Sequence, residues 1–378
     1  MKKGHVTGAI LSPANEDAES LVALLADCKK AGPQADLLID PQLYVATMSG
    51  VRDTKLAKHG WYPKKTLKPA SFTLRETPRI VGAALDWQYK LGVTTIVSPT
   101  VPITALDREP YSQISYMMAE EACVHHDESG DKRPLLISVL MREDALQRTE
   151  AVHEFFDRLR GLEPAPAGFY LIVERLNPGY TQSYEERALA NLLWCCHVLG
   201  NLDGMQVIVG YTDMVGILAQ AAGAKATACG WHQNLRYFHR KRWLPSTGGG
   251  LPRKRFTSLP LFDSLIMNPE LDALNIVGMY KDVRSGTTYD PKMPDELNWL
   301  LTTSTWHHWA SITEGAKRIK AAKTPRDRLD LVEEQIRQGL VLGKLIEKKG
   351  IPFEQRAPAA HLENWRHALR MFRDAVKI

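Results

Sequence analysis

The sequence contains little cysteine and no long apolar run. Only five of its 378 residues are cysteine, and none of them stand in C-x-x-C spacing. A disulfide framework is therefore not expected, and a reducing cytoplasm is the expected location. No stretch of about 18 apolar residues occurs, so we expect no membrane span. The short apolar stretch near the N-terminus does not predict a signal peptide.

A strong charge of one sign, internal repeats and low-complexity segments are missing as well. Forty-eight Lys and Arg against 43 Asp and Glu give a net charge of +5, and 44% of the residues are hydrophobic. This composition excludes a fibrous or wholly disordered chain, and it does not by itself indicate a nucleic-acid partner. A chain of this length buries enough apolar surface to fold without a disulfide or metal staple.

Short apolar runs alternate with longer amphipathic stretches, which predicts a parallel α/β fold. The expected strands are 5–11, 35–40, 94–98, 135–140, 168–173, 206–210, 224–229 and 274–277. The expected helices are 17–30, 71–91, 113–125, 145–162 and 185–199, with a shorter one before residue 224. The strands are continuously apolar rather than alternating, as expected for a sheet that is covered on both faces.

Eight such units predict a TIM (β/α)8 barrel, and an open doubly wound sheet is the alternative. Strand signals cease after Asp295, and residues 295–323, 325–349 and 359–376 show helical periodicity. We therefore expect a barrel domain over residues 1–292 and a C-terminal helical extension over residues 293–378.

The functional residues of a TIM barrel lie at the C-terminal ends of its strands. That rule selects Asp40, Ser98, Met141, Glu174, Tyr211, Asp213 and residues 229–232. Two long loops are expected at the same face. The first, residues 44–69, contains Lys55, Lys58, His59, Trp61, Tyr62, Lys64, Lys65 and Lys68.

The second long loop, residues 231–256, has seven basic residues and no acidic one. The basic residues are Arg236, Arg240, Lys241, Arg242, Arg253, Lys254 and Arg255. They are interleaved with Trp231, Tyr237, Phe238 and Trp243, a composition that suits phosphate contact with stacking or docking on an acidic protein surface. The alternative to a binding role is a solvated, mobile surface loop. The stretch 246–250 lacks the lysine of a P-loop and is interpreted as a hinge.

Two stretches of the sequence carry motifs of a known kind. Residues 40–44 read Asp-Pro-Gln-Leu-Tyr, and residues 207–210 (Val-Ile-Val-Gly) are followed by a helix and by residues 223–229 (Gly-Ala-Lys-Ala-Thr-Ala-Cys). The first stretch is similar to the D-S-G-G-Y signature, and the second resembles the L-M-G … G-x-D-x-F-D-C pattern, of the tRNA-guanine transglycosylase (queuine tRNA-ribosyltransferase-like) superfamily. The resemblance implies a TIM barrel that binds a 7-deazaguanine-type base. Asp40 would lie beside the reaction centre as general acid or base, and Tyr44 would stack on the base.

The sequence departs from this family at three places. Ala228 stands where the family has its nucleophilic Asp, and an alanine cannot form the ribosyl-enzyme ester. The family's zinc site, C-x-C-x-x-C with a distant His, is missing, which argues against tRNA. Residues 173–176 replace the glycine-rich base-binding stretch, and there Glu174 can accept N–H donors from a guanine-like edge.

Other candidate residues have both a functional and a structural interpretation. Gly210 and Tyr211 are expected to line the base pocket, while Cys229 is a second candidate catalytic group with His232 as its partner, although a buried cysteine is usually a small hydrophobe. Asp213 is expected to cap a helix. The pairs 125–126 and 307–308 are adjacent histidines that point to different sides of a helix, so no metal site is expected. We also expect no cofactor.

The resemblance thus implies a transferase that conjugates a 7-deazaguanine-type base to a non-tRNA acceptor. Because relatives in the superfamily accompany anti-phage systems, the expected acceptor is a partner protein such as a defence nucleotide cyclase, held by loop 231–256 and the helical extension. A second hypothesis is an enzyme that inserts a 7-deazaguanine into DNA or RNA. A third is a catalytically inactive TIM-barrel adaptor.

Overall fold

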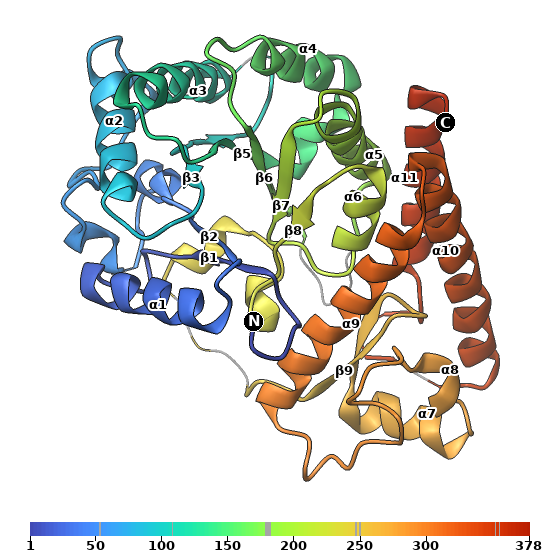
Figure 1. Cartoon of the computed structure of the whole chain (residues 1–378). Helices are drawn as coiled ribbons and strands as arrows, with labels where there is room; N and C mark the ends of the chain where they lie inside the picture. Colours follow the sequence, from blue (N-terminus) through green and yellow to red (C-terminus); the bar gives the residue numbers. More distant parts are fainter. Residues whose placement is uncertain are drawn as a thin grey trace. The chain divides into compact units, whose positions relative to one another are not determined.

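The computed structural model describes residues 1–52, 54–107, 109–177, 183–245, 248, 251–351, 353–354 and 356–378. The chain divides into two compact units (Figure 1). Unit 1 comprises Met1–Glu174, Asp203–Gly210 and Phe238–Thr247. Unit 2 comprises Arg175–Leu202, Tyr211–Tyr237 and Gly248–Ile378. The expected domain boundary between residues 292 and 293 stays a prediction.

Unit 1 contains parallel strands that follow one another in chain order. They are β1 (Gly8–Leu11), β2 (Asp36–Ile39), β3 (Ile96–Val97), β4 (Pro102–Ile103), β5 (Leu135–Arg142), β6 (Gly168–Glu174) and β7 (Gln206–Gly210). Strand β1 pairs with β2, β5 pairs with β3, β4 and β6, and β6 pairs with β7, each time in parallel. Hydrogen bonds between Leu37 and Thr94 connect β2 to the segment before β3. The prediction of an α/β fold with a mostly parallel sheet is confirmed.

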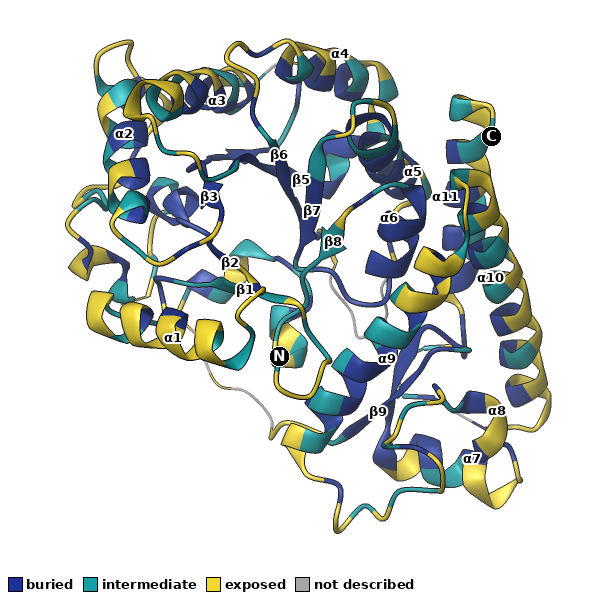
Figure 2. Ribbon diagram, in the orientation of Figure 1, coloured by how far each residue is buried: buried dark blue, intermediate teal, exposed yellow. Residues whose placement is uncertain are grey.

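The helices of unit 1 bury one side and expose the other, whereas its central strands are buried (Figure 2). The helices are α1 (Ala18–Ala31), α2 (Glu76–Tyr89), α3 (Pro110–Ser129) and α4 (Thr149–Arg160). Helix α1 begins where the Asp17 carboxylate accepts a hydrogen bond from the Ser20 amide at 3.0 Å. Helix α3 ends at Gly130, whose φ of +68° places it in the left-handed conformation that closes many helices.

The longest strands, β5 and β6, are apolar along almost their whole length, because both faces of the sheet are covered. Strands β6 and β7 approach each other closely at Gly168. A Cβ atom added there would lie 1.9 Å from the Gln206 carbonyl oxygen, so only glycine fits this position.

Unit 2 combines helices with a short strand and an antiparallel hairpin. Its helices are α5 (Glu186–Cys196), α6 (Gly216–Ala222), α7 (Asp272–Ile276), α8 (Tyr280–Val283), α9 (Leu301–Ala321), α10 (Pro325–Lys348) and α11 (His361–Val376). The strands are β8 (Ala226–Thr227), and β9 (Arg255–Ser258) paired with β10 (Asp263–Ile266). The three predicted C-terminal helices are confirmed. Helix α11 is tied to the segment just before α5 by a hydrogen bond from the Asn364 side chain, whose Nδ2 donates to the Tyr184 carbonyl oxygen at 3.1 Å.

One expected strand is wrong, and three described strands, β4, β9 and β10, were not expected. Residues 274–277, predicted as the eighth strand, form the end of α7 and the turn that follows it. Only Leu274 of this run is buried, while Ile276 is 83% exposed, so the apolar run is too short to distinguish strand from helix by pattern. Strands β9 and β10 carry polar residues at buried positions, which hides their strand character.

Among the described residues, no helix is long and apolar enough to span a membrane.

Candidate functional site

A buried carboxylate stands where β2 ends. The chain turns there through Gln42, whose φ of 57° is left-handed, and the Gln42 amide donates to Asp40 Oδ1 at 3.0 Å. The Tyr44 hydroxyl donates to Asp40 Oδ2 at 2.8 Å. The Gln42 side chain accepts from Ser12 Oγ at 2.9 Å and from the Ala14 amide at 3.2 Å, which ties the ends of β1 and β2 together. The expected spacing of Asp40 and Tyr44 thus brings the two side chains into contact.

A second carboxylate, that of Glu174, lies at the end of β6 and is held by Arg240. The Arg240 guanidinium donates to Oε1 through Nε at 2.6 Å and to Oε2 through Nη2 at 2.5 Å. The Arg240 backbone amide adds a third hydrogen bond, to Oε1 at 3.1 Å. Arg142 stands opposite Glu174 in the β5–β6 register and forms its own ion pair with Asp144. Glu174 is therefore charge-compensated within the fold, and a ligand at this carboxylate competes with Arg240.

The segment Phe238–Trp243, which we call the plug, covers the aromatic ring at the end of β2. The Tyr44 ring contacts Phe238 edge-on at a centroid distance of 5.2 Å and Trp243 at 6.2 Å. The Arg52 amide donates to the Trp243 carbonyl oxygen at 2.8 Å, which fixes the plug at its far end. Tyr44 is only 1% exposed as a result. A base stacked on Tyr44 requires the plug to move.

The remaining predicted base-binding residues do not line an open pocket. The Tyr170 ring fills the space next to the Cα atom of Gly210. A Cβ atom added to Gly210 would lie 2.5 Å from the Tyr170 hydroxyl oxygen. Tyr211, in unit 2, has a left-handed φ of 53°. These positions as ligand contacts stay predictions.

Cys229 is placed after β8, and its surroundings do not favour a nucleophile. Burial raises the pKa of its thiol to about 12, so little thiolate exists near neutral pH. The Sγ atom contacts the Gly230 carbonyl oxygen at 3.7 Å. His232, its predicted partner, is exposed.

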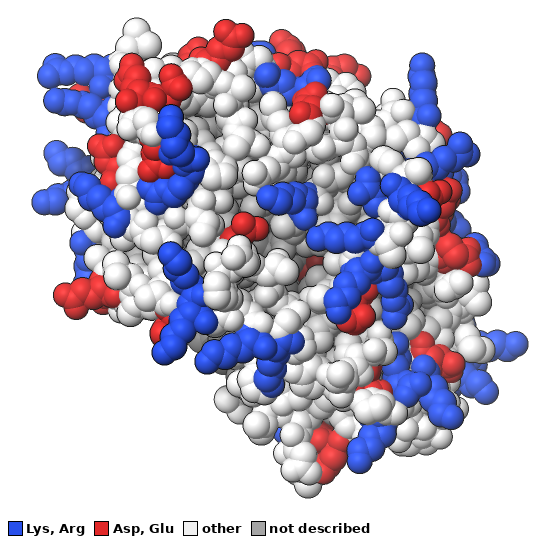
Figure 3. All heavy atoms as spheres, viewed as in Figure 1, with Lys and Arg blue, Asp and Glu red and all other residues white. Residues whose placement is uncertain are grey.

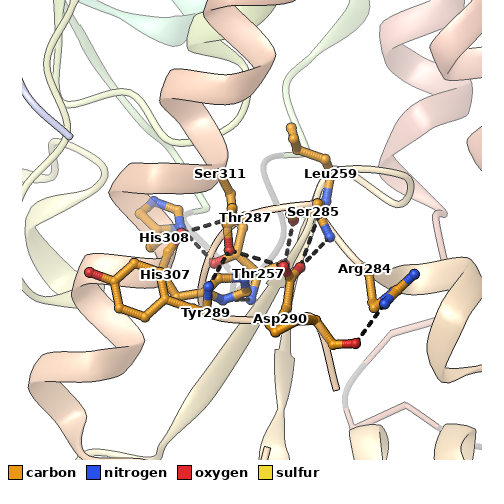
Figure 4. Close-up of polar contacts among 12 residues, drawn as sticks. Thr257, Leu259, Arg284, Ser285, Thr287, Tyr289, Asp290, His307, His308 and Ser311 are labelled. Atoms are coloured by element: carbon orange, nitrogen blue, oxygen red, sulfur yellow. Dashed lines mark hydrogen bonds and ion pairs between the residues drawn. The ribbon is translucent and has the colours of Figure 1, made fainter. Parts of the chain in front are cut away.

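Unit 2 contains a buried polar network that the sequence does not reveal (Figure 4). The adjacent residues His307 and His308 of α9 both contact Thr257 of β9: its amide donates to His307 Nδ1 at 3.2 Å, and its hydroxyl lies 3.0 Å from His308 Nδ1. Each histidine also meets a separate carboxylate. His307 Nε2 lies 3.5 Å from Asp290, and His308 Nε2 lies 3.0 Å from Asp213.

Asp213 contacts a histidine rather than capping α6, because no side-chain cap is present at that helix. Burial opposes the charged form of Asp213, but His308 and Arg236 outweigh it and lower its pKa. Burial, with the charge of Arg236, lowers the pKa of His308 to about 4. His308 is therefore neutral near pH 7, and the network is a structural tie between α9 and β9.

Most of the seven basic residues of the second long loop have partners inside their own unit. Arg240 holds Glu174, and Arg242 lies over the Trp243 ring at 5.0 Å. In unit 2, Arg236 donates to Gln233, Arg253 pairs with Glu354, Lys254 donates to the Glu296 carbonyl oxygen, and Arg255 donates to the Ser264 carbonyl oxygen. Lys241 is exposed. The predicted role of these residues in binding a partner or phosphate stays a prediction, and the hinge at 246–250 falls mostly outside the described residues.

Within the described part of the chain, no group of three or more His, Cys, Asp or Glu side chains is arranged to hold a metal ion. No family model and no curated protein matches this sequence.

Proposed function

We propose that the protein is a remodelled transferase of the tRNA-guanine transglycosylase type. It binds a 7-deazaguanine-type base near the ends of β2 and β6 and joins it to an acceptor other than tRNA. The observation that carries this proposal is the hydrogen bond between Tyr44 and Asp40, a carboxylate fixed at a strand end beside an aromatic ring. Glu174 supports it, because its two oxygens suit the paired N–H donors of a guanine-like edge.

The proposal includes a closed (β/α)8 barrel. The parallel strands of unit 1 follow chain order, as in a barrel, whereas a doubly wound sheet reverses its strand order at a switch point. The eighth strand cannot come from residues 274–277, which are helical. Another segment has to complete the barrel.

The chemistry proceeds without a covalent enzyme intermediate. Ala228 offers no carboxylate nucleophile, so no ribosyl-enzyme ester forms, and Asp40 serves as general acid or base in the transfer. The proposed acceptor is a partner protein of an antiviral defence system in the cytoplasm.

Calorimetry can test this proposal by measuring the affinity of the protein for 7-deazaguanine, with adenine as the control ligand. Variants of the plug then show whether its contact with Glu174 opposes binding. We expect 7-deazaguanine to bind, Glu174→Gln to weaken binding about tenfold, and Arg240→Ala to strengthen it, because Glu174 loses its internal competitor. Lys241→Ala is the matched control, since Lys241 is exposed in the same segment. Absence of binding to both the native protein and Arg240→Ala contradicts the proposal.

A second candidate function, a catalytically inactive adaptor, is favoured by the closed state of the site. Asp40 is only 2% exposed and Tyr44 is covered by the plug. An adaptor keeps its cellular function when Asp40→Asn and Glu174→Gln are introduced, whereas a transferase loses it.

A further inference from the structure

Unit 1 has an open pocket of about 450 Å³ that the proposed transferase site does not use. It is formed by the first long loop together with the 3₁₀ turn Pro69–Ser71 and the outer side of α2. Its lining is mainly apolar, with polar groups at one edge: Trp61, Pro63, Leu67, Ala70, Ile80 and Ala83, then Ser71, Thr73, Glu76 and Arg79. This volume lies in the range of binding pockets, which is about 300–1,000 Å³.

The loop that borders the pocket is strongly basic. Residues 54–75 include six Lys or Arg and no Asp or Glu. Lys58, Lys64, Lys65 and Lys68 are exposed, and the described parts of the chain offer none of them an ion-pair partner. The single acidic residue of the lining, Glu76, already accepts a hydrogen bond from Arg79 at 3.3 Å. Lys and Arg side chains, with acidic ones among them, project from the edge of unit 1 where α1 and α2 lie (Figure 3).

This uncompensated charge contrasts with the second long loop, whose arginines have internal partners. Arg240 is neutralised by Glu174, and in the first loop only Lys55 forms ion pairs among the described residues, with Glu16 and Asp17. The other four lysines of that loop are exposed. Charge that is not used inside the fold is available to attract a partner. The acid-binding surface expected from the sequence is therefore better placed on the first loop.

The loop is fixed beneath its lysines, so binding costs little ordering. His59 is 3% exposed, and its Nε2 lies 2.9 Å from the Glu16 carbonyl oxygen and 3.2 Å from that of Pro13. The Leu67 amide donates to the Ala46 carbonyl oxygen at 2.7 Å. A rigid surface loses less conformational entropy when it binds.

We propose that this pocket docks an acidic linear segment of a partner protein. One aliphatic side chain of the segment fills the space among Leu67, Ala70 and Ile80, and flanking carboxylates meet the exposed lysines of the loop that borders the pocket. A nucleic acid fits less well, because single-strand sites stack successive bases on several aromatic side chains, whereas Trp61 is the one aromatic residue among those that line this pocket. The proposal does not depend on base binding elsewhere in unit 1.

The test measures fluorescence anisotropy of a labelled nine-residue peptide with one leucine flanked by Asp and Glu, using the full chain. We expect binding that weakens about tenfold in Lys64→Glu/Lys65→Glu and also in Ala70→Trp, which fills the pocket. Lys29→Glu/Lys30→Glu is the matched control, since both lysines are exposed on α1 and the charge change is the same. This control should bind as tightly as the native protein.

Three results would overturn the proposal. The first is equal affinity for a peptide in which leucine is replaced by serine, because charge alone would then explain binding. The second is tighter, lysine-dependent binding of a twelve-residue oligo-dT, which identifies a nucleic-acid surface. The third is an equal loss in the α1 control. The two surface lysines are solvent-exposed, so their variants keep the test decisive even if Ala70→Trp fails to fold.

Discussion

Arg240 donates three hydrogen bonds to the Glu174 carboxylate, two from the guanidinium (Nε and Nη2) and one from its backbone amide. The two residues lie 66 positions apart in the chain. The carboxylate is 4% exposed and the guanidinium 35%. This ion pair joins the end of β6 to the plug, so the side chain proposed to hold the base also keeps the plug in place.

The first prediction concerns the mobility of the plug. Arg240→Ala removes the guanidinium from Glu174, and residues 238–245 should then exchange their amide hydrogens about tenfold faster in hydrogen-exchange mass spectrometry. Lys241→Ala, in the same segment, should leave exchange unchanged. Unaltered exchange in Arg240→Ala would show that the aromatic contacts alone hold the plug.

The second prediction concerns the Asp40–Tyr44 hydrogen bond. Tyr44→Phe keeps the ring but removes the donor from a buried carboxylate, so the free energy of unfolding should fall by about 1–3 kcal/mol. Urea unfolding followed by circular dichroism measures the change. Tyr116→Phe, which keeps the ring that packs against Arg158, should be nearly neutral. Equal effects of the two substitutions would mean that the Tyr44 hydroxyl contributes nothing special.

The third prediction concerns acid stability through His308. Its pKa is lowered from the ordinary 6.5 to about 4 in the folded state, so protons bind preferentially to the unfolded chain. The stabilisation is fully present above pH 6.5 and is lost as the pH falls toward 4 and through it. His308→Gln should therefore unfold with a flatter pH dependence between these values, measured by the urea midpoint at each pH.

The exposed His232→Gln variant is the control for this experiment and should keep the native profile. A native slope in His308→Gln would assign the acid sensitivity to other groups. His307 and His361, whose pKa values burial also lowers, are the next to examine.

The fourth prediction concerns Arg356, which binds two buried carboxylates. It contacts Asp263 at 2.7 Å and Glu270 at 3.1 Å, and all three side chains are nearly inaccessible. Arg356→Met leaves both carboxylates without their cation and should cost about 3–5 kcal/mol of unfolding free energy. Arg337→Met, which breaks an exposed pair with Glu334, should cost less than about 1 kcal/mol. A similar loss in both variants, by urea unfolding, would contradict the buried role.

The sequence predicts the elements of this fold best where a single physical signal is strong. Strand β7 matches its prediction residue for residue because it is a short run of β-branched residues, 207–209, between Gly204 and Gly210. Helix α10 begins at Pro325 as predicted, since Thr324 and Asp327 cap each other reciprocally. The prediction of a strand at residues 274–277 was wrong, because a pattern of four mostly apolar residues fits a strand and a helix equally well.

The site shows a similar division between local and distant contacts. The contact of Asp40 with Tyr44 follows from a four-residue spacing at a strand end. The pairing of Glu174 with Arg240 joins distant segments, and no periodicity in the chain encodes it. The two adjacent histidines each contact a separate carboxylate, and these carboxylates come from other parts of unit 2, which one sequence does not disclose.

The tie between α5 and α11 has a consequence for synthesis on the ribosome. Helix α5 is made at residues 186–196, but the side chain of His367 that meets Glu186 at 2.9 Å emerges much later. Until translation reaches α11, the part of α5 that α11 covers lacks its partner helix, and exposed apolar surface of this kind favours association with chaperones or other chains. The packing of α5 is thus complete only after α11 has left the exit tunnel.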